Sequence, residues 1–168
     1  YGNFKHLTKG KQMKQLLLTA IIFLSLTTNA ASTGTLLLSG VVEPVNDISI
    51  APTANATTLN ITNGEITKLI ATATETSNNL TGYRITIRST NSSKLIHTID
   101  NSKFTTYTIS YNGGPYISLT TTDQEVKNVT SLNGLTTQSS DIKVNVVAYP
   151  TAPTGTYNDL VTISIAAN

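Results

Sequence analysis

Short runs of alternating apolar and polar residues recur roughly every ten positions from residue 31 to residue 168, with turn residues between them. Alternation with a period of two places one set of side chains on each face of an extended backbone. The runs are rich in Ile, Val and Thr, which favour a pleated surface, and the gaps are rich in Asn and Gly, which favour turns. The pattern predicts an all-β fold, an antiparallel immunoglobulin-like β-sandwich.

The last run, residues 156–168, alternates most clearly. Pro153 and Gly155 supply a turn before it, and we expect one half-buried strand that leaves no room for a further strand of the same chain. If the sheet needs a neighbour at this position, another segment must provide it. The polar face carries hydroxyl and amide side chains, and the apolar face carries Tyr157, Val161, Ile163 and Ile165.

Residues 35–42 differ from the other runs because they are apolar on both faces. Such a strand is either buried between two layers or shared between two partners.

Clear breaks in the sequence separate the remaining runs. We predict strands at residues 47–51, 57–61, 66–74, 83–89, 95–99, 104–111, 116–119, 124–129 and 141–149.

The front of the chain has the pattern of an export signal. Met13 and Lys14 are followed by an apolar run at residues 16–26 and by small residues up to Ser32. This arrangement predicts a secretory signal peptide at residues 13–30, and the run is too short to span a bilayer as a helix. Residues 1–12 are interpreted as a non-native leader or an over-long gene prediction. Residues 31–168 then form a single exported domain with no membrane span after signal cleavage.

The net charge changes when the front end is set aside. The formal charge of +2 divides into +4 over residues 1–30 and −2 over residues 31–168, without a cluster of Lys and Arg in the latter. This distribution argues against nucleic acid as a partner. The chain has no Cys, so disulfides cannot stabilise the exported domain and packing and strand pairing must do so.

The residues expected of an enzyme or a metal site do not converge in the sequence. His97 is the one histidine after residue 31, and its alternation with Leu95 and Ile99 predicts a half-buried strand histidine bonded to a neighbour. The acidic residues are scattered beside predicted turns, where turn bonding explains them. We therefore predict no catalytic residues, no metal site and no cofactor, and a protein that is not an enzyme.

Both ends of the predicted domain resemble those of chaperone–usher pilins, the subunits of bacterial fimbriae. The similarity lies in Gly34-Thr35-Leu36-Leu37-Leu38-Ser39-Gly40-Val41-Val42-Glu43-Pro44-Val45 near the start and in the Gly155-Thr156-Tyr157-Asn158-Asp159 turn that leads into the last strand. It is closest to the archaic and spore-coat-U-like branch. The chain departs from many pilins in having no disulfide after its first strand, which fits only the cysteine-free members.

The resemblance implies a sandwich with an incomplete edge that a donor strand fills. A periplasmic chaperone would fill it first, and an outer-membrane usher would then exchange the chaperone strand for the N-terminal segment of an identical or related subunit. On this interpretation Tyr157, Val161, Ile163 and Ile165 edge the acceptor groove. Residues 31–42 hold the candidate donor strand, with Thr35, Leu36, Leu37, Leu38, Val41 and Val42 as its site residues.

The resulting hypothesis is a structural subunit of a surface pilus or coat, with a role in cell adhesion or biofilm formation. The alternative is a self-contained secreted β-sandwich that binds a carbohydrate or a host protein without polymerising. The two differ in whether residues 32–42 complete their own sheet or that of another molecule.

Overall fold

The computed structural model of this chain describes residues 31–168, so the predicted leader at 1–12 and the predicted signal peptide at 13–30 lie outside the described residues. Val41–Asn168 forms one compact unit, and residues 31–40 belong to a separate unit. Residues 31–45 contain no helix or strand. Among the described residues, no helix is long and apolar enough to cross a membrane.

The prediction of an all-β antiparallel fold is confirmed. Every strand pair of the described chain is antiparallel, and the single helical element is one short 3-10 turn. In chain order the elements are β1 (Asn46–Pro52), η1 (Ala54–Thr57), β2 (Glu65–Ser77), β3 (Tyr83–Ser89), β4 (Lys94–His97), β5 (Phe104–Tyr111), β6 (Gln124–Val129), β7 (Thr136–Val146), β8 (Tyr157–Asn158) and β9 (Val161–Ala167).

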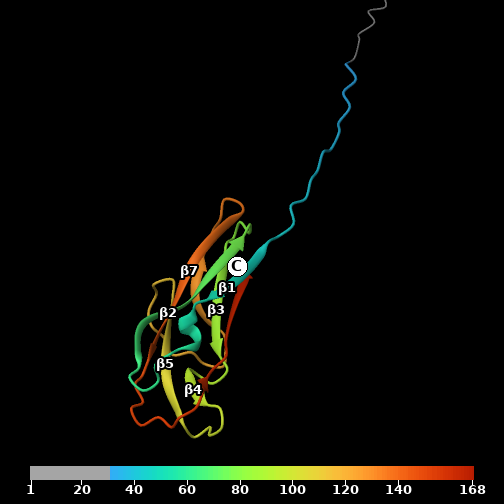
Figure 1. Ribbon diagram of the computed structural model, residues 1–168. Coiled ribbons are helices and arrows are strands. Elements are labelled where there is room, and N and C mark those ends of the chain that lie inside the picture. The colour runs from blue at the N-terminus through green and yellow to red at the C-terminus, as the bar shows by residue number, and fades with distance from the viewer. Residues whose placement is uncertain (1–30) are drawn as a thin grey trace, which may run out of the picture. The chain divides into compact units, whose positions relative to one another are not determined.

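The strands form two sheets that share one core (Figure 1). The six-stranded sheet has the order β1-β2-β7-β5-β4-β8, and the three-stranded sheet has the order β6-β3-β9. Alternation places Tyr83, Ile85 and Ile87 of β3 on the inner face, where they are at most 1% exposed. They pack against apolar side chains of the larger sheet, among them Ile109 and Ile142.

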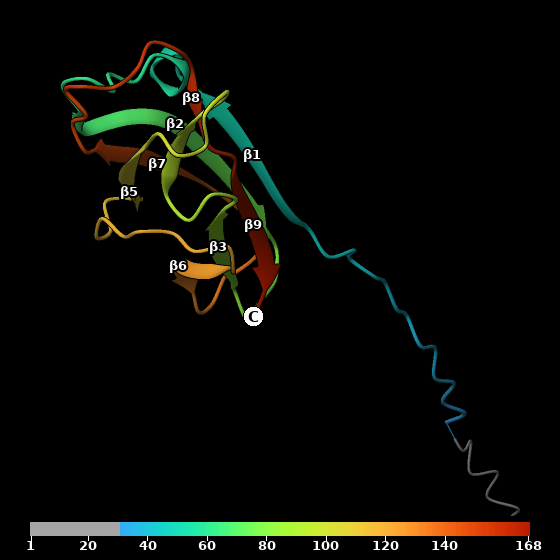
Figure 2. The same ribbon diagram turned by 90° about the horizontal axis from the view of Figure 1, so that it is seen from below.

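Each sheet ends in an open strand edge on the same side of the molecule. Within residues 31–168, strand β1 pairs only with β2, and β9 pairs only with β3. These two terminal strands lie side by side and run in opposite directions (Figure 2). No described strand fills the second edge of either one, so both present unpaired backbone groups.

A polar cluster replaces apolar packing at one end of the core. Glu75 of β2 is 1% exposed and lies between the sheets, where it accepts hydrogen bonds from Tyr83, Tyr111, Ser140 and Lys127. Burial by itself raises the pKa of Glu75, but the hydrogen bonds from these four partners outweigh burial and hold the pKa below its usual value. The strands therefore continue here although the apolar pattern of the sequence stops.

Several of the predicted strand positions are wrong. Residues 57–61 form the end of η1 and an irregular segment instead of a strand, and residues 116–119 make one isolated bridge, Ile109 with Ile117. Residues 35–42 form no strand. The final run is two strands in different sheets, because the chain crosses from the larger sheet to the smaller one between β8 and β9.

Candidate functional site

The inner face of β9 is less covered than that of its neighbour β3. Val161, Ile163 and Ile165 point toward the core but are only partly buried. Their strand partners include Ile85 opposite Ile165 and Ile87 opposite Ile163, and both partners are 0% exposed. The interior is therefore closed on the β3 side of β9 and open on its unpaired side.

A groove with a mixed polar and apolar lining begins where β9 begins. Two adjoining cavities of about 430 and 90 Å³ share Ala56, Leu59, Leu95 and Asp159 in their lining, and together they form what we call the groove. Side chains of the larger sheet reach its floor, so the groove opens onto the core. The floor residues are Ile70, Leu95, Tyr107, Ile109 and Val144.

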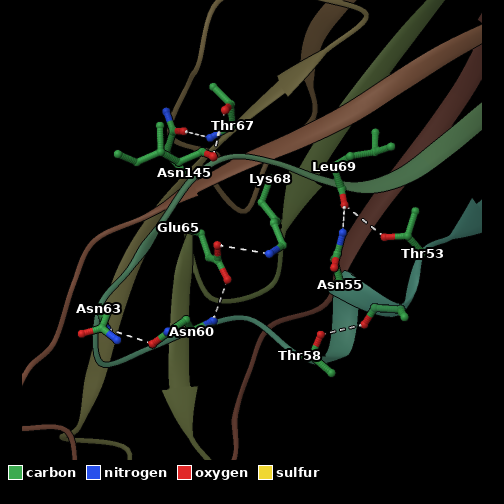
Figure 3. Close-up of polar contacts among 12 residues, drawn as sticks. Thr53, Asn55, Thr58, Asn60, Asn63, Glu65, Thr67, Lys68, Leu69 and Asn145 are labelled. Carbon is green, nitrogen blue, oxygen red and sulfur yellow. Dashed lines mark hydrogen bonds and ion pairs between the residues drawn. The ribbon is translucent and has the colours of Figure 1, made fainter.

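The first wall of the groove is the connection between β1 and β2, which carries Leu59 and Ile61. Figure 3 shows how polar side chains hold this connection against β2. The hydroxyl of Thr53 and the side-chain amide of Asn55 both donate to the carbonyl oxygen of Leu69, each at 3.0 Å. These bonds satisfy one carbonyl beside a bulge in β2 and fix η1 at the groove.

Further along the same wall, the chain turns back on itself. The backbone N–H of Asn60 donates to Oε1 of Glu65 at 3.0 Å, and the N–H of Asn63 donates to the side-chain oxygen of Asn60 at 2.9 Å (Figure 3). The Asn63-Gly64 turn thus closes an irregular loop. Glu65 also forms an ion pair with Lys68 at 3.5 Å.

The second wall runs from Gly155 to Val161, and contacts with His97 hold it in place. Nδ1 of His97 accepts the N–H groups of Ile99 and Asp100, so Nε2 carries the ring hydrogen and donates to the carbonyl oxygen of Thr154 at 3.1 Å. The ring also meets Tyr157 edge to face with centroids 5.1 Å apart. His97 is 5% exposed, so it is the bonded structural histidine that the sequence predicts, although more buried than expected.

Asp159 fixes the point where the chain changes sheet. Its carboxylate accepts the hydroxyls of Ser89 at 2.5 Å and Tyr107 at 2.7 Å, and the N–H groups of Asn91 at 3.0 Å and Leu160 at 2.8 Å. Burial and the bond to Asp159 together raise the pKa of Tyr107, so this phenol stays protonated as a donor. These bonds connect Asp159 to both sheets and so fix the position of the second wall relative to the floor.

The structure brings together the predicted groove-edge residues only in part. Tyr157 and Val161 line the groove, whereas Ile163 and Ile165 continue along the open edge of β9. The candidate donor residues are strongly exposed, with Leu36, Leu37, Leu38, Val41 and Val42 between 82% and 87%. Thr35 is exposed as well.

Two parts of the site were not predicted from the sequence. Leu59 and Ile61 were assigned to a strand, and the periodicity of so short a run could not reveal a groove wall. Glu75 was also overlooked, although it shares the alternation of Ala71 and Ala73, which places all three side chains on one face of β2. Within residues 31–168, no group of three or more His, Cys, Asp or Glu side chains is placed to hold a metal ion.

A scan against protein-family models finds no match to this chain. A search of curated proteins by sequence also finds none that matches.

Proposed function

We propose that this chain is a structural subunit of a bacterial surface fibre or coat that assembles by donor-strand exchange. The observation that carries the proposal is the unpaired edge of β9, whose inward apolar row is only half covered, beside the unpaired edge of β1. An added strand between these edges would pair with free backbone groups and cover the row with its own alternate side chains.

The strand order supports this proposal. An immunoglobulin-type sandwich orders its sheets A-B-E-D and C-F-G. Taking β1, β2, β7 and β5 as A, B, E and D, and β3 and β9 as C and F, reproduces the pairs A–B, B–E, E–D and C–F, whereas β6 beside β3 and β4 with β8 beside β5 lie outside this order. The position that remains open is G, on the free edge of β9, and it is the position that a donor strand takes in this proposal.

The N-terminal segment has the chemistry of the donor. Apolar side chains point both ways along residues 35–42, so one face can enter the groove while the other covers its rim. Each well-buried Leu or Val contributes on the order of 1.5 to 3 kcal/mol, and several such anchors would make release of the strand slow. The segment is supplied by an identical or related subunit.

The proposal also implies an assembly pathway. The chain is exported, a periplasmic chaperone covers the groove with a strand of its own, and an outer-membrane usher exchanges that strand for the donor. The finished fibre stands on the cell surface and serves adhesion or biofilm formation. The subunit needs no cofactor for this and is not an enzyme.

One observation favours the alternative, a self-contained secreted domain that binds a carbohydrate. A second surface cavity of about 320 Å³ is lined by amide and hydroxyl side chains, which suit sugar hydroxyl groups. The polar residues in its lining are Asn91, His97, Thr98, Asn101 and Asn158.

The experiment that separates the two functions compares residues 31–168, purified from a periplasm, with residues 43–168. Donor-strand exchange predicts ladders of the longer chain that survive cold SDS and collapse on boiling. It also predicts that the shorter chain is unstable until a peptide of residues 31–43 is added. A longer chain that remains a sharply melting monomer would rule out the fibre and favour the secreted binding domain.

A further inference from the structure

One end of the sandwich, here called the basal end, gathers four chain segments. Asn46 at the start of β1 pairs with Ser77, and so does Thr136 at the start of β7. Tyr83 at the start of β3 pairs with Ala167 near the end of β9. The segment that precedes β1 therefore leaves the domain at the basal end, beside the β2–β3 and β6–β7 connections.

Asn78 fixes the point where that segment leaves. Its side-chain oxygen accepts the N–H of Val45 at 2.7 Å, and its side-chain amide donates to the carbonyl oxygen of Glu43 at 2.8 Å. The backbone N–H of Asn78 also donates to the carbonyl oxygen of Val45 at 3.2 Å. Three bonds from one residue thus hold residues 43–45 to the basal end.

The two connections beside this point each expose one leucine. Leu80 is 71% exposed and Leu135 is 69% exposed, and a backbone bond from Leu132 to Leu80 joins the two connections that carry them. Residues 78–82 and 130–135 contain no Asp, Glu, Lys or Arg. Two exposed leucines on adjoining connections suit a protein interface.

The link between the donor segment and β1, residues 42–45, is short, and its length indicates what covers this surface. Val42 is the last apolar residue of the donor segment, and the three steps from Val42 to Val45 reach at most about 10 Å. A molecule that accepts residues 35–42 is thereby held directly against the basal end. We infer, on the basis of the proposed function, that the basal end with Leu80 and Leu135 seats against the second copy of this chain that accepts its donor strand.

Thiol labelling of the full chain, expressed from Met13 and exported, tests this inference. The chain has no Cys, so a maleimide reports on each single variant alone: Leu80→Cys, Leu135→Cys and the control Thr106→Cys, an exposed position on β5. We expect the labelling rate at positions 80 and 135 to fall at least about tenfold from monomer to SDS-resistant ladder, because a covered thiol reacts slowly. The rate at position 106 should stay the same.

The outcomes separate this inference from the proposed function. Ladders in which positions 80 and 135 react as fast as in the monomer overturn the basal contact and leave donor-strand exchange standing. The absence of ladders overturns both. Equal protection at position 106 indicates nonspecific aggregation and also overturns the basal contact.

Discussion

Nζ of Lys127 lies 2.6 Å from Oε2 of Glu75, a carboxylate whose side chain is 0% exposed. The pair joins the two sheets, because Lys127 belongs to β6 and Glu75 to β2. Lys127 also donates to Gln138 at 2.9 Å and to Ser140 at 3.1 Å. A charge pair of this kind is sensitive to the loss of one partner, because the other then stays buried without compensation.

Replacing Glu75 tests how much this ion pair contributes to the stability of the fold. We expect Glu75→Gln to lower the free energy of unfolding by about 3 to 5 kcal/mol, since Lys127, whose side chain is only 12% exposed, would lose its ion-pair partner. Urea unfolding of the two chains measures the difference. The matched control is Asp141→Asn, which removes an exposed partner of Lys143 and should cost less than about 1 kcal/mol. Similar losses for the two variants would contradict the buried role of Glu75.

The same carboxylate predicts how stability depends on pH. The pKa of Glu75 lies below its usual value of 4.5 in the folded chain, so the unfolded chain binds the proton more readily. The stabilisation is complete above pH 4.5 and is lost as the pH falls through the lower, folded pKa. Melting temperatures between pH 7 and pH 2.5 should therefore drop on the acid side, and Glu75→Gln should flatten that drop. A parallel decline in both chains would assign the effect to other acids.

Gly155 is predicted to be essential for the second wall of the groove. Its φ of +148° is one that residues with side chains rarely adopt, and a Cβ there would collide with Nε2 of His97. Gly155→Ala should cost more than about 1 kcal/mol in urea unfolding and weaken binding of the 31–43 peptide. Gly134→Ala is the control, because Gly134 has a φ of +138° with nothing within 4 Å of the added atom. Equal costs would show that backbone strain alone, without the collision, explains the loss.

Truncating Ile163 should harm the completed sandwich more than the open one. Ile163 is only partly buried in the free domain, so Ile163→Ala removes fewer contacts there than it would beneath an added strand. We expect the melting temperature of the peptide-bound domain to fall further than that of the free domain. Ile87→Ala provides the contrast, because Ile87 is already 0% exposed and should cost about the same in both states. If Ile163 behaves like Ile87, the peptide does not cover β9.

The sequence predicted the strands best where the core is apolar. The predicted strand at residues 83–89 coincides with β3, whose inward residues are Tyr83, Ile85 and Ile87. At the Glu75 cluster the prediction ended β2 at residue 74 and began β7 at residue 141, although the strands continue to Ser77 and from Thr136. Buried polar side chains leave no apolar alternation, so the pattern cannot mark a strand that they complete.

The groove was predictable only on its β9 side. Alternation identifies Val161, Ile163 and Ile165 as one face, but it cannot show that an adjacent position in the sheet is empty. The break at Asp159 was also hidden, because side chains from β3 and β5, distant in the sequence, hold the carboxylate. Such contacts depend on tertiary structure and have no signature in a local pattern.

The anchoring of Glu43 and Val45 by Asn78 has a mechanical consequence. A pull at residue 45 that is directed along β1 would load the seven residues of β1, which pair with β2 from Asn46 opposite Ser77 to Pro52 opposite Ala71. The load is then spread over the whole ladder as shear, and its hydrogen bonds must yield together instead of opening one after another. A domain loaded in this direction resists tension far better than one peeled from the end of a strand.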